Sequence, residues 1–101
     1  CVYDGYQQTQ PGIYNVRATV GYKVAQNVTV PEGMHVASVL EGPYQHFCAT
    51  GKLPDCIAAK WEDIWRNNDT LYRAFVTDFE VYGEKAQDPE NAEMDIFLSV
   101  L

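Results

Sequence analysis

Helical spacing of apolar residues marks one segment of this chain, and the segments around it alternate in the manner of β-strands. The predicted helix begins at Pro54, because the missing proline N–H costs nothing in a first helical turn. Its apolar stripe consists of Ile57, Trp61, Ile64 and Trp65. A chain of 101 residues forms one compact domain. This helix therefore has to cover most of a sheet, and part of one face stays open.

The predicted strands lie on both sides of that helix. Apolar and polar residues alternate most regularly over 13–24 and 94–101, as they do in half-buried antiparallel strands. The complete set of predicted strands is 2–6, 13–24, 34–40, 44–50, 71–82 and 94–101. The sequence therefore predicts an α+β fold in which an antiparallel sheet carries one main helix. With 34–40 and 44–50 counted as one strand that Glu41-Gly42-Pro43 interrupts, the order is strand, strand, strand, helix, strand, strand.

The end of the chain resembles its beginning. In both parts a short aromatic strand, a polar loop with proline and an alternating strand follow one another. A tandem strand–helix–strand–strand unit explains this similarity, with 34–101 as the complete second copy and 1–30 as the last two strands of an incomplete first copy. We therefore expect a strand and a helix upstream of Cys1, and one domain over 1–101.

Charge and cysteine content exclude several classes of protein. The net charge is −7 and the seven basic residues are spread singly, so the chain repels polyanions, and its field favours cations. No apolar run is long enough to span a membrane. Three cysteines in no zinc-binding pattern predict inert, reduced thiols, a cytoplasmic location and no metal or cofactor. Asn27-Val28-Thr29 fits a glycosylation acceptor, but a cytoplasmic location argues against its use.

Glu80 is the main candidate for a functional side chain. It lies in a strand that is otherwise aromatic and apolar, where alternation places it on one face with Asp78 and Tyr82. A carboxylate in such surroundings is costly to desolvate unless something pairs with it, and an organic cation beside aromatic rings would do so. Alternatively, Glu80 faces water or pairs with Arg73 or Lys52.

Aromatic residues are the other candidates for a binding site. Trp61 and Trp65 lie one helical turn apart and fit either a core or the wall of a cleft. The tyrosines that could line a pocket include Tyr44, Tyr72 and Tyr82. Catalytic motifs are absent, although His46 with Cys48 could form a nucleophilic pair and Glu80 could act as a general base.

Several motifs resemble those of the gyrase-inhibitor-like effector-binding superfamily, which includes the sensor domains of AraC-type and MerR-type bacterial multidrug regulators. Small stand-alone members carried on integron gene cassettes are the most similar. The resemblance rests on Gly51-Lys52-Leu53-Pro54, Trp61 with Ile64-Trp65, Tyr72-Arg73-Ala74, Asp78-Phe79-Glu80-Val81-Tyr82 and Asn91-Ala92-Glu93-Met94-Asp95-Ile96. It implies two strand–helix–strand–strand units around a pseudo-twofold axis, with a ligand cleft between them.

The resemblance implies that Glu80 is the buried carboxylate that pairs with cationic, aromatic drugs, and that Trp61 and Tyr82 line the cleft. We therefore expect a binding module for lipophilic cations, not an enzyme. Two alternatives remain, a hydrolase of reactive small molecules that uses Glu80 to activate water, and a macromolecule-binding protein of the gyrase-inhibitor type. Because the first unit lacks a strand and helix, a homodimer could supply the missing wall of the cleft.

Overall fold

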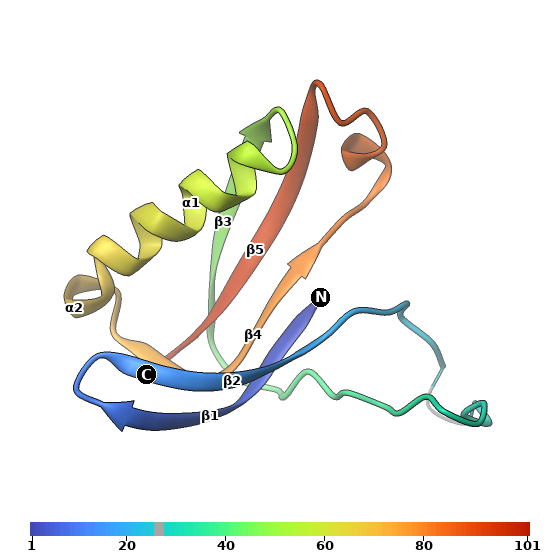
Figure 1. The fold of residues 1–101 in the computed structure, drawn as a ribbon, viewed down its shortest axis with the longest axis horizontal. Coiled ribbons are helices and arrows are strands. Elements are labelled where there is room, and N and C mark those ends of the chain that lie inside the picture. Colours follow the sequence, from blue (N-terminus) through green and yellow to red (C-terminus); the bar gives the residue numbers. More distant parts are fainter. Residues whose placement is uncertain (26–27) are drawn as a thin grey trace.

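A five-stranded antiparallel sheet with one long helix on one face makes up this protein, seen in a computed structural model that describes residues 1–25 and 28–101 (Figure 1). The elements are β1 (Val2–Gln10), β2 (Ile13–Thr19), β3 (Tyr44–Gly51), α1 (Asp55–Arg66), α2 (Asn68–Leu71), β4 (Arg73–Val81), the 3₁₀ turn η1 (Glu84–Ala86) and β5 (Ala92–Val100). The strands lie in the order β2-β1-β4-β5-β3. The predicted α+β class and the predicted order of elements are confirmed.

Helix α1 crosses one face of the sheet and buries its apolar stripe there (Figure 1). Ile64 is fully buried against Ile96 and Leu98 of β5, and Trp61 packs against the edge of this cluster. Trp65 is 58% exposed, so the end of the predicted stripe lies outside the core. The helix-covered side is called the helix face below, and the opposite side the open face.

Strand register decides which side chains lie on each face. Glu80 of β4 is opposite Ile96, and Asp78 is opposite Leu98, so both carboxylates lie on the helix face. Phe79 is opposite Phe97 and their rings stack on the open face, with centroids 4.8 Å apart. The prediction that Asp78 and Glu80 share a face is confirmed by this register.

Two hairpins, β1–β2 and β4–β5, meet where β1 pairs antiparallel with β4. An antiparallel junction of two hairpins is what a pseudo-twofold repeat would produce at its centre. The tandem repeat itself, with its incomplete first copy, stays a prediction.

The strand limits differ from the predicted ones where pairing partners differ. Strand β1 runs past residue 6 to Gln10 because Gln7 and Gln8 pair with Asn15 and Tyr14 of β2. Strand β4 begins at Arg73, not at 71, because the chain leaves α2 through a left-handed residue, Tyr72, with φ 53°.

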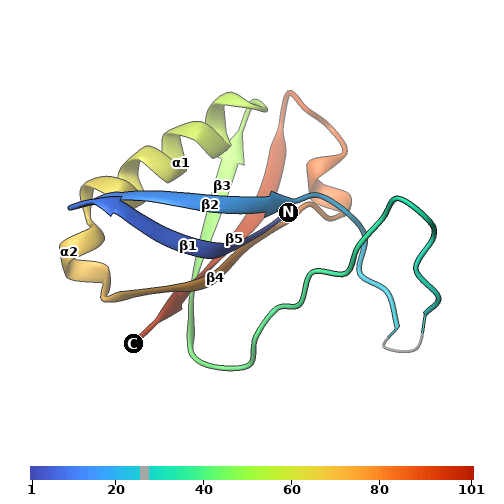
Figure 2. The same ribbon diagram turned by 60° about the horizontal axis from the view of Figure 1, so that its bottom comes forward.

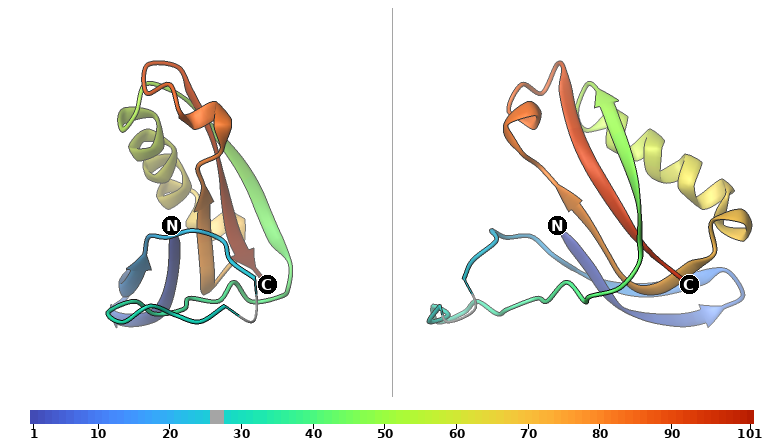
Figure 3. Two further views of the ribbon diagram at one scale, coloured as in Figure 1. Left: turned by 90° about the vertical axis from the view of Figure 1, so that its right-hand side faces the viewer. Right: turned by 180° about the vertical axis from the view of Figure 1, so that it is seen from behind.

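The prediction of a strand over 34–40 is wrong, and the strand predicted over 13–24 ends at Thr19. Strands need a neighbour for their backbone groups, and these residues have none. The segment between β2 and β3 connects the two edges of the sheet and extends away from its body (Figures 2 and 3). Asn27, of the glycosylation triplet, lies outside the described residues. Among those described, no helix is long and apolar enough to cross a membrane.

Candidate functional site

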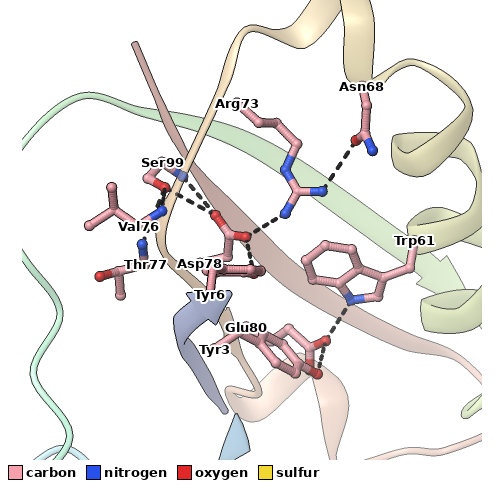
Figure 4. Close-up of polar contacts among 10 residues, drawn as sticks. All are labelled: Tyr3, Tyr6, Trp61, Asn68, Arg73, Val76, Thr77, Asp78, Glu80 and Ser99. Atoms are coloured by element: carbon pink, nitrogen blue, oxygen red, sulfur yellow. Dashed lines mark hydrogen bonds and ion pairs between the residues drawn. The ribbon is translucent and has the colours of Figure 1, made fainter. Parts of the chain in front are cut away.

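The Glu80 carboxylate is the centre of a small polar cluster on the helix face, between β1 and α1 (Figure 4). Glu80 is only 6% exposed. Its Oε1 accepts hydrogen bonds from the Tyr3 hydroxyl at 2.9 Å and from the Trp61 indole N–H at 2.6 Å. Its Oε2 accepts a third from the Tyr82 hydroxyl at 2.6 Å. Three aromatic side chains, from β1, from α1 and from the residue that follows β4, therefore converge on one carboxylate.

No cation neutralises this carboxylate within the described part of the chain, because none of its ion pairs includes Glu80. Arg73, a partner considered from sequence, pairs with Asp78, and Lys52 is exposed. A carboxylate offers about four acceptor positions, and three are occupied by neutral donors. Glu80 is thus a buried acidic group with one acceptor position left and no counter-charge.

The sequence brings these donors together by three separate routes. Tyr82 follows Glu80 by two residues along the same chain direction, and Trp61 lies on the apolar stripe of α1. Tyr3 arrives through the pairing of β1 with β4, in which it is opposite Asp78. Tyr3 was missed from sequence because 77 residues separate it from Glu80 and no local pattern reveals the pairing.

Burial and the hydrogen bond to Glu80 raise the pKa of Tyr3 above its ordinary value. The same causes raise the pKa of Tyr82, although this side chain is 49% exposed and water screens part of the effect. Tyrosine hydroxyls are protonated at neutral pH in any case, and the raised pKa values keep both of them as donors to the carboxylate at higher pH as well.

A second buried carboxylate, Asp78, lies two residues before Glu80 and is fully satisfied. Its Oδ2 accepts from the Arg73 guanidinium at 2.6 Å and from the Tyr6 hydroxyl, and its Oδ1 accepts from the Ser99 N–H at 3.0 Å. Arg73 also donates to the Asn68 side chain at 3.2 Å. In contrast to Glu80, Asp78 has a cationic partner.

A bulge in β1 brings Tyr6 to the same face as Tyr3. Residues three apart in a regular strand point to opposite faces. The register shifts between Asp4 and Gln7, and Gly5 has φ 65°, which glycine adopts without a Cβ penalty. The extra residue lets Tyr3 reach Glu80 while Tyr6 reaches Asp78.

Four aromatic side chains next to Glu80 form an aromatic rim, which consists of Tyr3, Trp61, Trp65 and Tyr82. The Tyr3 and Trp61 rings meet edge to face with centroids 5.6 Å apart, and the Trp65 ring lies 6.2 Å from Trp61. Because Trp65 and Tyr82 are largely exposed, this rim is accessible from solvent. Of the candidates from sequence, the structure thus brings Glu80, Trp61, Tyr82 and Trp65 to one place.

Tyr44 and Tyr72 lie away from that place. The Tyr44 ring packs edge to face against Phe79 on the open face, with ring centroids 5.4 Å apart. Tyr72 is exposed where α2 meets β4. Two shallow surface hollows of about 370 and 390 Å³ also lie elsewhere, and Glu80 lines neither. The side chains of the three donors therefore cover most of the Glu80 carboxylate in this structure.

The alternative nucleophile lies on the open face. Cys48 donates weakly to the Glu93 carboxylate at 3.6 Å, while His46 contacts Asp95 at 2.6 Å. Burial and Glu93 raise the pKa of the Cys48 thiol, which keeps it protonated and weakly nucleophilic. Across the described residues, no three His, Cys, Asp or Glu side chains are grouped so that they could hold a metal.

The fold and this cluster define an α+β ligand-binding domain, and comparison with known proteins identifies the family. The family model Cass2, described as integron-associated effector binding protein, matches residues 2–100, and the chain belongs to that family. The predicted resemblance is confirmed. Membership of an effector-binding family implies a small-molecule ligand.

A curated Bacillus subtilis (strain 168) protein, YobU, named as a candidate transcriptional regulator, is 24% identical over 100 residues. The match covers 98% of this chain and 61% of that protein, so the chain spans about three fifths of the relative's length. No solved structure gives a significant match.

Proposed function

We propose that this domain binds lipophilic, aromatic cations, with Glu80 as the counter-charge and nearby aromatic side chains as the lining. The observation that supports the proposal is a carboxylate 6% exposed, surrounded by neutral donors and unpaired with any cation among the described residues. Burying such a group without a partner costs stability. An organic cation that loses little hydration on burial would offset that cost, because it supplies the missing positive charge beside the remaining acceptor position of the carboxylate.

The aromatic rim suits the apolar part of such a ligand. Trp61 and Trp65 present rings on one side of α1, and Tyr82 is half exposed beside Glu80. A cation over these ring faces gains roughly 0.5–2 kcal/mol for each ring. Tyr82 is the donor that a ligand displaces at least cost, because its hydroxyl can bond to water instead. Tyr44 and Tyr72 carry no part of the proposal.

The test is a fluorescence anisotropy titration with rhodamine 6G, a lipophilic aromatic cation. We expect micromolar binding by the wild type and at least a tenfold weaker affinity for Glu80→Gln, equivalent to about 1.4 kcal/mol. Glu62→Gln makes the same chemical change at an exposed position of α1 and should bind as the wild type does. Equal affinities of Glu80→Gln and the wild type would refute a cation site at Glu80.

The proposal makes the domain a sensor or sequestering module, not an enzyme. Hydrolysis with Glu80 as general base requires an acceptor position free for water, and one such position is available. Mass spectrometry of the dye or of an ester substrate after long incubation separates the two functions, because binding returns the compound unchanged. If Glu80→Gln leaves the binding of a macromolecule intact while dye binding is absent, the function is of the gyrase-inhibitor type.

We also propose that two copies associate into a homodimer in the cytoplasm, where the three thiols stay reduced. Support comes from the exposed apolar side chains of the segment between β2 and β3, which include Val20, Tyr22 and Met34. Light scattering over a range of protein concentrations tests for this dimer.

A further inference from the structure

Two carboxylates lie two residues apart on the helix face of β4, and they differ in charge balance. Asp78 forms an ion pair with Arg73 at 2.6 Å, in which the side chains are 0% and 4% exposed. Glu80 accepts from three neutral donors and belongs to no ion pair of the described chain. The local sum over Arg73, Asp78 and Glu80 is therefore a single negative charge.

We infer that the Arg73–Asp78 pair fixes the charge of the ligand site at −1 and so selects singly charged over doubly charged aromatic cations. This inference rests on the proposed function of Glu80. Arg73 and Asp78 act here as residues that determine specificity without touching the ligand. Their effect is electrostatic, through the balance of charge beside the bound cation.

Trp61 lies between the Arg73–Asp78 ion pair and the Glu80 carboxylate. Its indole N–H donates to Glu80, while the Arg73 guanidinium carbon lies 6.0 Å from the centroid of the Trp61 ring. Figure 4 shows the indole with Arg73 on one side and Glu80 on the other. A second positive charge on that side of Trp61 would therefore face the guanidinium, and the neighbouring Asp78 carboxylate is already paired with it.

Arg73 is held so that it cannot itself neutralise Glu80. Its guanidinium bonds to Asp78 and Asn68 and stacks over the Phe75 ring, 4.3 Å from the centroid. Without Asp78, the strongest of these anchors is lost, and the nearest unpaired carboxylate on the strand is Glu80. Asp78 thus keeps the internal cation away from the site that an external cation has to occupy.

Stability alone gives a weak reason for this ion pair. The desolvation of two buried charges offsets most of their attraction, and well-packed apolar residues often replace such pairs at no loss. A purely structural pair would have no influence on which ligand charge is preferred. The ratio of affinities for two ligands that differ only by one charged group therefore separates the two roles.

Ethidium and propidium provide such a pair, because they share a phenanthridinium ring and propidium carries an additional quaternary ammonium. At about physiological salt, we expect the wild type to bind ethidium at least tenfold tighter than propidium. The protein's net charge of −7 acts in the opposite direction, since it attracts the dication more strongly. Equal or tighter propidium binding by the wild type would overturn the inference, with no variant needed.

Three variants then test the assignment to Arg73 and Asp78. Arg73→Gln leaves Asp78 unpaired, and should shift the ratio towards propidium by at least tenfold. Asp78→Asn releases Arg73 towards Glu80, and should weaken ethidium binding at least tenfold although Glu80 is intact. The double variant restores a site charge of −1, and should recover the wild-type ratio. Circular dichroism confirms that each variant is folded before it is compared.

The outcomes distinguish this inference from the proposed function. If the wild type binds ethidium in a manner that depends on Glu80, but the ratio is the same in the wild type and in the folded variants, the inference is wrong and the proposed function stands. If the wild type binds neither dye, both are wrong. Tyr6→Phe removes a neutral donor from Asp78 without a change of charge, and should leave the ratio as in the wild type.

Discussion

At the scale of single residues, Glu80 combines burial with a lack of counter-charge. Hydrogen bonds to a charged group contribute roughly 1.5–3 kcal/mol each, so its three donors offset much of the desolvation cost. They leave the negative charge itself in place. The neighbouring Asp78, by contrast, shows how the same strand satisfies a structural carboxylate, with a guanidinium.

The sequence predicted three members of this cluster, Glu80, Trp61 and Tyr82, but not Tyr3. Strand alternation places Glu80 and Tyr82 on one face, and the helical stripe includes Trp61, but this periodicity left open whether Glu80 faces water. The family resemblance was what assigned all three residues to a ligand cleft. Tyr3 depends on a strand pairing across most of the chain, which no local pattern specifies.

Ionisation of Tyr3 and Tyr6 should make the stability of the fold depend on pH in the alkaline range. Burial and hydrogen bonds to Glu80 and Asp78 raise the pKa of Tyr3 and Tyr6 above the usual 10.0. Above about pH 10 the unfolded chain releases protons that the folded chain keeps, so the stabilisation is complete below that pH and is lost as pH rises further. We expect the urea midpoint to fall as the pH rises above about 10, and to fall less in Tyr3→Phe. An equal fall in both proteins would contradict this assignment.

Among the secondary-structure elements, the bulge in β1 determines how Asp78 and Glu80 each receive a hydrogen bond from a tyrosine. Tyr3 and Tyr6 flank Gly5, and the shift of register between Asp4 and Gln7 turns both phenols to the helix face. The sequence predicted a strand here but no bulge. A single glycine between aromatic residues is compatible with either geometry until the β1–β4 pairing is known.

Replacement of Gly5 by alanine tests the bulge. A Cβ would meet Arg17 Cβ at 3.9 Å, an ordinary contact, so the cost comes from φ 65° alone. We expect the free energy of unfolding to fall by about 1–2 kcal/mol, the usual cost of a left-handed backbone for a residue with a side chain. Gly83→Ala, at φ −96° in open space, should change it by less than about 0.5 kcal/mol. Similar urea midpoints for the two variants would show that the bulge carries no strain.

The wrong prediction over 34–40 has a physical cause at the same scale. Its β-branched composition favours a strand, but propensity acts only where a neighbouring strand accepts the backbone hydrogen bonds. In the described chain both sheet edges, β2 and β3, are left unpaired beside this segment. Residues 34–40 therefore stay outside the sheet although both of its edges are free among the described residues.

At the scale of the whole molecule, the surface is large for the mass. A compact monomer of 11.4 kDa exposes about 5,800 Å², and this chain exposes 7477 Å². Its radius of gyration is 14.6 Å, where about 13 Å is expected. The excess of about 1,700 Å² per chain is roughly twice the 800 Å² or so that each partner buries in a standard protein–protein interface.

The exposed apolar residues after β2 are the part of this surface that a second copy would cover. Val20 is 85% and Tyr22 96% exposed, and with Val24 they continue the alternation of β2 beyond its last paired residue. Two copies related by a twofold axis could pair these residues reciprocally, so that one contact satisfies the backbone groups after β2 in both copies. Light scattering over about 1–200 μM should give the mass of a dimer that dissociates on dilution.

Charge placed in that contact should separate the copies without harm to the monomer. We expect Val20→Asp with Tyr22→Asp to give a monomer at every concentration, because both side chains are exposed in the single chain and their replacement costs little there. Ile13→Asp puts one negative charge at the opposite end of β2, for comparison with each single variant, and should leave the dimer intact. A wild type that is monomeric throughout would show that the excess surface is not covered by a second copy. If Ile13→Asp also dissociates the dimer, the contact extends along β2 and is not confined to the residues that follow it.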